Sequence, residues 1–174
     1  MANAYNIEKS FLARLSVANT QYPGPVGYWE YSPGLNGRKA WHSSGWLTTS
    51  RPDIQPLALW FGAVEQPGEA APVYEIRLWT GSVAHSTANQ RVDISTNGYL
   101  GLYGHSSKVG PLWRIEPVAA SRVHLKTLDN KGVGVDWEQA FWTSARKGSY
   151  LCVGAAPAAV FEMELVRMGV PAPA

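Results

Sequence analysis

Tryptophans adjoin polar, chemically active side chains at two places in this 174-residue sequence, Trp41-His42 and Asp136-Trp137. An indole face packs against the apolar C–H groups of a sugar, while a carboxylate or imidazole exchanges hydrogen bonds with its hydroxyls. Small-ligand sites combine these two features. The sequence-based candidates for ligand binding are Trp41, His42, Asp136, Trp137, Trp29 and Asn130. The alternative is that such rings only cover the ends of a barrel, or lie in a membrane or protein interface.

Motifs of the common catalytic sites are missing from the sequence. It has no HExxH, no Walker loop, no GxGxxG after a strand and no GxSxG elbow. The four histidines, His42, His85, His105 and His124, do not have the spacing of a metal site. A glycosidase needs two facing carboxylates, which a sequence cannot reveal. We expect a non-enzymatic protein with no catalytic residues, no metal and no cofactor.

Composition narrows the partners and the compartment. The net charge is +2 and the basic residues are scattered, so nucleic acid is not expected as a partner. Cys152 is the only cysteine, which excludes an intrachain disulfide and suits a small buried residue on a strand. The first residues lack a secretory signal, and no apolar run is long enough for a transmembrane helix. We expect synthesis in the cytoplasm, with lysis or a non-classical route as the means of any release.

The elements that would position these candidates recur at intervals of about 50 residues. The recurring unit is a Trp or Tyr residue, then a leucine, and then a second aromatic residue that closes the unit. The leucines are Leu47, Leu100 and Leu151, and the closing aromatics are Trp60, Trp113 and Phe161. Residues 10–66, 73–119 and 121–167 are the three copies, within one domain of residues 1–174. Trp46, Tyr99 and Tyr150 precede the leucines, so alternation points them away from those leucines, toward a secondary layer or the surface.

Each copy is expected to contain four short strands. The expected strands are 11–18, 26–31, 46–50, 57–64, 73–80, 91–95, 99–103, 112–118, 123–127, 133–137, 150–153 and 159–167. Asn97-Gly98 is a strong hairpin turn, because both positions favour positive φ. Residues 32–44 are expected to form a long polar loop that carries Trp41 and His42. Short strands with regular turn signals and no helical periodicity indicate an all-β fold.

The third copy carries the clearest resemblance to a known family. Val123-His124-Leu125-Lys126, Asn130-Lys131-Gly132, Tyr150-Leu151 and Phe161-Glu162-Met163 follow in the order typical of that family. The chain resembles the β-trefoil superfamily, most closely its fascin-like and ricin-B-like members. The resemblance implies an all-β trefoil of three four-stranded units. Ricin-type sugar modules have Gln two residues before the closing aromatic, where this chain has Ala58, Pro111 and Ala159. Their sugar sites therefore do not transfer as a set.

The function expected from these observations is a lectin-like module that recognises glycans or cell-surface glycoconjugates through aromatic-bearing loops. An alternative is an insecticidal or cytolytic toxin, or toxin component, that uses the trefoil to contact a receptor or membrane. A further alternative is a protease inhibitor in which Arg38, Lys39 or Lys108 enters a trypsin-like pocket. Folds host many functions, so the resemblance alone does not choose among these. The sequence leaves the sugar, the number of binding lobes and the oligomeric state open.

Overall fold

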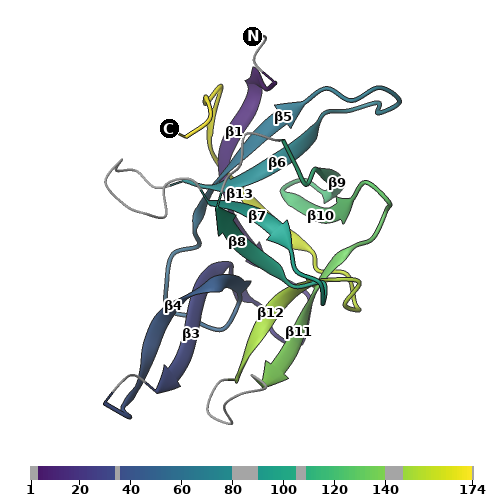
Figure 1. Cartoon of the computed structure of the whole chain (residues 1–174). Helices are drawn as coiled ribbons and strands as arrows, with labels where there is room; N and C mark the ends of the chain where they lie inside the picture. The colour runs from purple at the N-terminus through teal and green to yellow at the C-terminus, as the bar shows by residue number, and fades with distance from the viewer. Residues whose placement is uncertain (1–3, 34–35, 80–89, 105–108, 140–146, 174) are drawn as a thin grey trace.

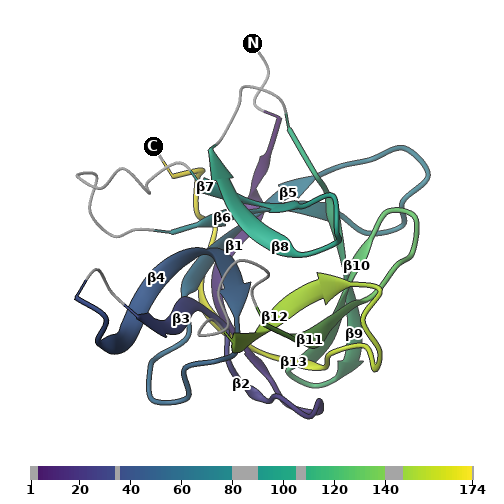
Figure 2. The ribbon, with the colours of Figure 1, turned by 60° about the horizontal axis from the view of Figure 1, so that its bottom comes forward.

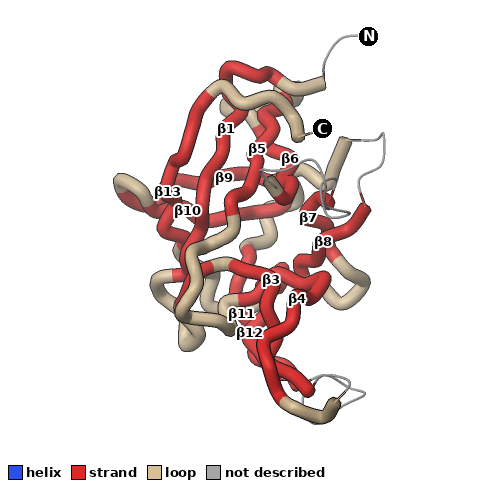
Figure 3. The backbone as a smooth tube through the Cα atoms, turned by 90° about the vertical axis from the view of Figure 1, so that its left-hand side faces the viewer, coloured by secondary structure: helices blue, strands red, loops and turns tan. Residues whose placement is uncertain are grey.

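The computed structural model describes residues 4–33, 36–79, 90–104, 109–139 and 147–173, and these form strands, turns and loops without a helix (Figure 3). The strands are β1 (Asn6–Val17), β2 (Gly24–Pro25), β3 (Gly27–Pro33), β4 (Lys39–Thr48), β5 (Ala58–Val64), β6 (Val73–Leu78), β7 (Gln90–Ile94), β8 (Leu100–Gly104), β9 (Trp113–Ala119), β10 (Arg122–Thr127), β11 (Val133–Gln139), β12 (Lys147–Val153) and β13 (Phe161–Met168). The all-β prediction is confirmed, and every expected strand has a counterpart. Consequently, no described helix is available to cross a membrane.

Six strands close into an antiparallel barrel. Their order around the barrel is β6-β5-β1-β13-β10-β9, and pairing of β9 with β6 closes the ring. The closing contact pairs Tyr74 with Trp113. A closed barrel leaves no unpaired sheet edge in the ring, which removes a common site of aggregation. The turns between β5 and β6 and between β9 and β10 lie at one end of this barrel (Figure 1).

Three hairpins, β3–β4, β7–β8 and β11–β12, continue the sheet beyond the barrel. They join one another where Trp46 of β4 pairs with Gly101 of β8, and where Tyr150 of β12 pairs with Thr48 of β4. Strand β7 connects them to the barrel through β6. Figure 2 brings this end of the molecule toward the viewer and shows the hairpins side by side.

The prediction of a β-trefoil is wrong, because the structure is a closed six-stranded antiparallel barrel. The copies also differ: β4 has ten residues, whereas β7 and β8 have five each. Trp60 shows that residues at equivalent positions of the repeat do not all occupy equivalent positions in the structure. It was matched to Trp113 and Phe161, but Leu59 and Phe61 face the main core and Trp60 faces the other side of β5. A shift of one residue along a strand reverses the face that a side chain occupies.

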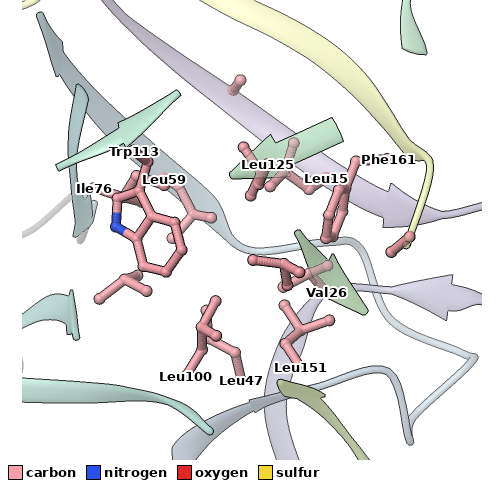
Figure 4. Close-up of a cluster of buried hydrophobic side chains, with 14 of the residues drawn as sticks. Leu15, Val26, Leu47, Leu59, Ile76, Leu100, Trp113, Leu125, Leu151 and Phe161 are labelled. Carbon is pink, nitrogen blue, oxygen red and sulfur yellow. The ribbon is translucent and has the colours of Figure 1, made fainter. Parts of the chain in front are cut away.

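The main core lies inside the barrel and against the hairpins. Leu47, Leu100 and Leu151 come from the three hairpins and meet there, as the repeat predicted (Figure 4). Trp113 and Phe161 are also fully buried in this core. Burying a large apolar side chain contributes about 1.5–3 kcal/mol relative to leaving it exposed. These side chains therefore fix the positions of the hairpins on the barrel.

A smaller cluster covers the outer face of β1 and β5. Leu12, Trp60 and Val170 are buried in it, and Tyr5 and Trp79 pack against them. The indole nitrogen of Trp60 donates a 2.8 Å hydrogen bond to the carbonyl oxygen of Val170. The segments near the two ends of the chain are thereby held against the barrel wall.

The predicted loop over residues 32–44 is mostly strand. Strand β3 extends to Pro33 and β4 begins at Lys39, so only a short connection separates them. Trp41 and His42 consequently lie on β4 and not in a loop. The pairing of Glu30 with His42 and of Tyr31 with Trp41 explains this difference, because the ladder continues through a polar stretch. The polar composition of residues 32–44 alone therefore predicted a loop that is too long.

Candidate functional site

Four aromatic side chains from the three hairpins form one connected surface, which we call the aromatic face: Trp46, Tyr99, Tyr103 and Tyr150. The Trp46 ring meets Tyr99 and Tyr103 edge-on, with centroid distances of 6.3 and 6.5 Å. Tyr99 meets Tyr150 edge-on at 6.0 Å. Edge-to-face contacts are a favoured geometry for aromatic pairs. The exposed fraction falls from 39% at Tyr103 to 7% at Tyr150, so the face runs from an exposed rim to a buried base.

Glycines in the hairpin strands make room for these rings. A Cβ atom on Gly101 would lie 2.7 Å from the Tyr103 ring and 3.2 Å from the Trp46 ring. A Cβ atom on Gly148 would lie 3.3 Å from the Tyr150 ring. A side chain at Gly101 would displace the Tyr103 ring, and one at Gly148 would displace the Ser50 hydroxyl, which would lie 2.8 Å from the added Cβ atom, and crowd the Tyr150 ring. The sequence thus makes room for the Trp46, Tyr103 and Tyr150 rings by placing glycine against them.

Two carboxylates adjoin the aromatic face. The Tyr150 hydroxyl donates a 2.9 Å hydrogen bond to Oε1 of Glu30, whose side chain is buried. The Tyr99 hydroxyl lies 3.4 Å from Oδ2 of Asp136, an exposed residue, and donates to it. Carboxylate oxygens accept hydrogen bonds from ligand hydroxyls, and phenols both donate and accept them. The face therefore combines flat apolar rings with oriented polar groups.

His42 lies beside Glu30 in the β3–β4 ladder. Residues paired directly across strands project to the same side of the sheet, so His42 faces the same side as Glu30. Its ring nitrogen Nε2 is buried without a hydrogen-bond partner among the described residues. A buried nitrogen of this kind is uncommon, because most buried polar atoms are hydrogen-bonded.

Strand alternation separates the sequence-based candidates into two groups. Asp136 pairs with Tyr150 and belongs to the aromatic face, whereas its neighbour Trp137 pairs with Ser149 on the opposite side. In the same way, His42 pairs with Glu30 and Trp41 pairs with Tyr31. The structure brings His42 and Asp136 to one side of the hairpins. It does not bring Trp41 or Trp137 to them.

Trp29 and Trp41 are brought together by a cation. The guanidinium carbon of Arg51 lies 4.7 Å from the Trp29 ring centroid and 5.5 Å from that of Trp41. The Arg51 Nε also donates a 3.2 Å hydrogen bond to Asp53. Such cation–π contacts are worth about 0.5–1 kcal/mol each at exposed sites. A ligand must use the other faces of these rings or displace Arg51.

The two remaining candidates lie apart from this pair. Trp137 is 48% exposed and stacks on Tyr22 with a centroid distance of 5.3 Å. Asn130 lies in the turn between β10 and β11, where it adopts a positive φ of 67°. Asn tolerates that conformation better than most residues. Its backbone N–H donates to the carbonyl oxygen of Thr127, so a role in forming the turn is evident.

Sequence reasoning did not select Glu30, Tyr103 or Arg51. The repeat makes Trp46, Tyr99 and Tyr150 equivalent and directs them away from the core leucines, and in the structure they lie outside the main core cluster that holds those leucines. The available signal for the site was this away-facing triplet, since one member comes from each hairpin. Glu30 carried no signal, because its partner Tyr150 is 120 residues away in sequence.

The described residues contain no group of three or more His, Cys, Asp or Glu side chains that could hold a metal ion. His124 Nδ1 forms a 2.9 Å hydrogen bond with the carbonyl oxygen of Ala159, while His85 and His105 lie outside the described residues. Cys152 is a buried free thiol on β12, as predicted. These placements give no separate chemistry to His124 or to the Cys152 thiol.

A buried ion pair lies on the outer wall of the barrel. Arg77 Nε donates a 2.6 Å hydrogen bond to Glu75, and its Nη2 donates a 2.8 Å bond to the Tyr5 hydroxyl. The Glu75 carboxylate also accepts from Tyr5 and from the backbone N–H of Gly110. Burial, together with the Glu75 charge, raises the pKa of Tyr5 to about 12. The cluster ties the N-terminal segment to β6, which is a structural role.

Comparison of the chain with models of known protein families found no match, and comparison with curated proteins found none either.

Proposed function

We propose that this protein is a non-enzymatic, lectin-like module that binds glycans at the aromatic face. The observation that supports the proposal is the association of four aromatic rings with the carboxylates of Glu30 and Asp136 across three hairpins. Apolar rings with a few fixed polar groups are the usual composition of small-ligand sites. The partners would be glycans or cell-surface glycoconjugates.

Each part of the face has a defined task in this proposal. The exposed edge of Tyr103 and the ring of Trp46 pack against the C–H groups of a sugar. Asp136 accepts hydrogen bonds from sugar hydroxyls, and the Tyr99 hydroxyl orients its carboxylate. Glu30 is buried, so its task is to hold Tyr150 in place and not to contact the ligand. Rigid placement lowers the ordering cost of binding.

A glycan array followed by calorimetry tests the proposal. We expect saturable binding of one sugar class, accompanied by a change in tryptophan fluorescence. Tyr103→Ala and Asp136→Asn should each weaken binding about tenfold, which corresponds to the loss of one good contact. Trp137→Ala is the matched control, because it removes an exposed ring from the opposite side of β11. If folded protein bound no glycan on the array, the proposed glycan-binding function would be rejected.

The control also decides the position of the site. Weakened binding in Trp137→Ala with unchanged binding in Tyr103→Ala would place the site on the opposite side of the hairpins. Trp41→Ala tests the Trp29–Arg51–Trp41 cluster in the same way. Either result would retain glycan binding and reject the aromatic face.

The toxin and inhibitor functions stay predictions, since no described contact favours either one. Arg38 and Lys39 are exposed at the β3–β4 connection, and Lys108 lies outside the described residues. Exposure of basic side chains is common on protein surfaces. Trypsin inhibition and cell-killing assays on the wild-type protein would test these alternatives directly.

A further inference from the structure

A groove with a volume of about 520 Å³ opens at the barrel end that carries the β5–β6 and β9–β10 turns. This end lies away from the β3–β4 and β11–β12 hairpins (Figure 1). Apolar and aromatic side chains from four barrel strands line it: Phe11, Tyr74, Val123, Met163, Leu165 and Met168. The volume lies within the range of about 300–1,000 Å³ that is typical of small-ligand sites.

The closure of the barrel explains why the groove exists. Strands β6 and β9 pair at Tyr74 and Trp113, and β9 then continues in a ladder with β10. Beyond that point, Arg114 holds the β5–β6 turn through hydrogen bonds of 2.6–3.2 Å to the Glu69 carboxylate. This contact joins the β5–β6 and β9–β10 turns beside the open end of the barrel. Inward-facing side chains of the barrel strands line the groove at this open end.

The lining suits an alkyl chain. Met163 and Met168 are unbranched and adaptable, and methionine commonly fills irregular apolar spaces. The exposed fractions of Leu165 and Met168 are 54% and 51%, so the groove presents apolar surface to solvent. Phe11 and Tyr74 form a fixed wall, because their rings meet edge-on at 5.4 Å.

Two polar groups accompany this apolar lining. Lys9 Nζ lies 2.9 Å from Oε1 of Glu65 in an exposed ion pair, which leaves further ammonium protons for another acceptor. The Tyr74 hydroxyl forms no hydrogen bond with the described residues. Lys9 and Tyr74 both line the groove. Burial raises the pKa of Tyr74, and the Lys9 charge opposes that effect. Together they offer an ammonium and a phenol hydroxyl to an anionic head group.

We propose that this groove binds an amphiphile that has a medium-length alkyl chain and a carboxylate. The chain lies against Phe11, Met163 and Met168, and the carboxylate accepts hydrogen bonds from Lys9 and Tyr74. The Lys9 ammonium, which Glu65 also contacts, and the Tyr74 hydroxyl supply hydrogen-bond donors to the two oxygens of one carboxylate. This binding is separate from glycan recognition, because the groove and the aromatic face share no residue.

Methionine methyl NMR provides a direct test with dodecanoate as the probe. The chain contains three methionines, and two of them line the groove. We expect dodecanoate, below its micelle concentration, to shift the Met163 and Met168 methyl signals saturably with one molecule bound per chain. Met163→Leu and Met168→Leu assign the signals. Leu165→Glu places a charge at an exposed lining position and should abolish binding without unfolding the protein.

The role of the cation has its own control. Lys9→Gln should weaken dodecanoate binding by up to about fivefold, the range for an exposed ion pair. Lys126→Gln is matched to it, since Lys126 also pairs with an exposed glutamate, at 2.8 Å, but lies outside the groove lining. The wild-type protein should bind dodecanol more weakly than dodecanoate. The Lys9→Gln variant should bind the two ligands with equal affinity.

Three outcomes would overturn the proposal. Unchanged methyl signals in folded protein would mean that the groove takes no alkyl carboxylate. Equal affinity for dodecanol and dodecanoate would remove the carboxylate from the ligand class. A ligand-free dimer in sedimentation that dissociates in Leu165→Glu would show that a second copy of the chain occupies the groove.

Discussion

Tyr150 and Glu30 join two hairpins through a buried hydrogen bond of 2.9 Å between residues 120 positions apart in sequence. Tyr150 belongs to β12 and Glu30 to β3, and both side chains are almost completely buried. The bond therefore fixes the base of the aromatic face. It also gives a desolvated carboxylate one of its hydrogen-bond donors, which a buried charge requires.

Removing the Tyr150 hydroxyl should destabilise the protein and weaken glycan binding together. We expect Tyr150→Phe to lower the free energy of unfolding by about 1–3 kcal/mol, because the Glu30 carboxylate loses a donor. Urea denaturation measures the change. Tyr103→Phe is the control: this ring is exposed at the rim, so its hydroxyl should contribute less than about 0.5 kcal/mol. Equal effects of the two changes would contradict a special role for Tyr150.

Gly62 is required by the Trp60 indole. A Cβ atom on Gly62 would lie 2.1 Å from the Trp60 ring, so Gly62→Ala must displace that ring or the strand. We expect a loss of about 1–3 kcal/mol, as is usual for overpacking. Gly45→Ala is matched to it, because a Cβ there meets no atom within 4 Å. Thermal unfolding compares the two variants. A smaller loss for Gly62→Ala than for Gly45→Ala would show that Trp60 does not hold its position.

The buried Glu75–Arg77 pair predicts an asymmetric response to substitution. Arg77→Met leaves the Glu75 carboxylate buried without its cation and should cost about 3–5 kcal/mol. Glu75→Gln combined with Arg77→Met should recover part of this loss, because the remaining side chain is neutral. The exposed Arg122–Glu162 pair is the control, and Arg122→Met should cost at most about 1 kcal/mol. A double variant no more stable than Arg77→Met would argue against an electrostatic cause.

The sequence predicted the strands and the direction of the key side chains. Strand alternation placed Leu47, Leu100 and Leu151 in the core and turned Trp46, Tyr99 and Tyr150 away from those leucines. The structure agrees, because the main core cluster contains the three leucines and none of the three aromatics. These inferences depend on a period of two residues, which is local. Candidates were chosen as neighbouring pairs such as Trp41-His42, yet the same alternation sends neighbours to opposite sides of a sheet. Pairs separated by one residue would have been a better choice.

The closure of the barrel and the contacts across hairpins could not be predicted. Tyr74 with Trp113, and Glu30 with Tyr150, are contacts between segments far apart in the chain. A repeat of about 50 residues indicates similar local units, but it does not specify which strands pair. Trp60 illustrates the limit, since its chemistry matches Trp113 while its register places it on the other face. Register depends on the partner strand, which sequence spacing does not identify.

Tyr5 should make stability fall at alkaline pH. Burial and the Glu75 charge raise its pKa from the usual 10.0 to about 12, so the folded protein holds this proton more tightly than the unfolded chain. The stabilising contribution is therefore complete below pH 10 and declines as the pH rises through 12. Tyr5→Phe lacks this group, while every other tyrosine titrates in both proteins. We expect the stability advantage of the wild-type protein over Tyr5→Phe to shrink between pH 10 and 12, as measured by urea denaturation. An advantage that stays constant across this window would show that Tyr5 has the same pKa in the folded and unfolded states.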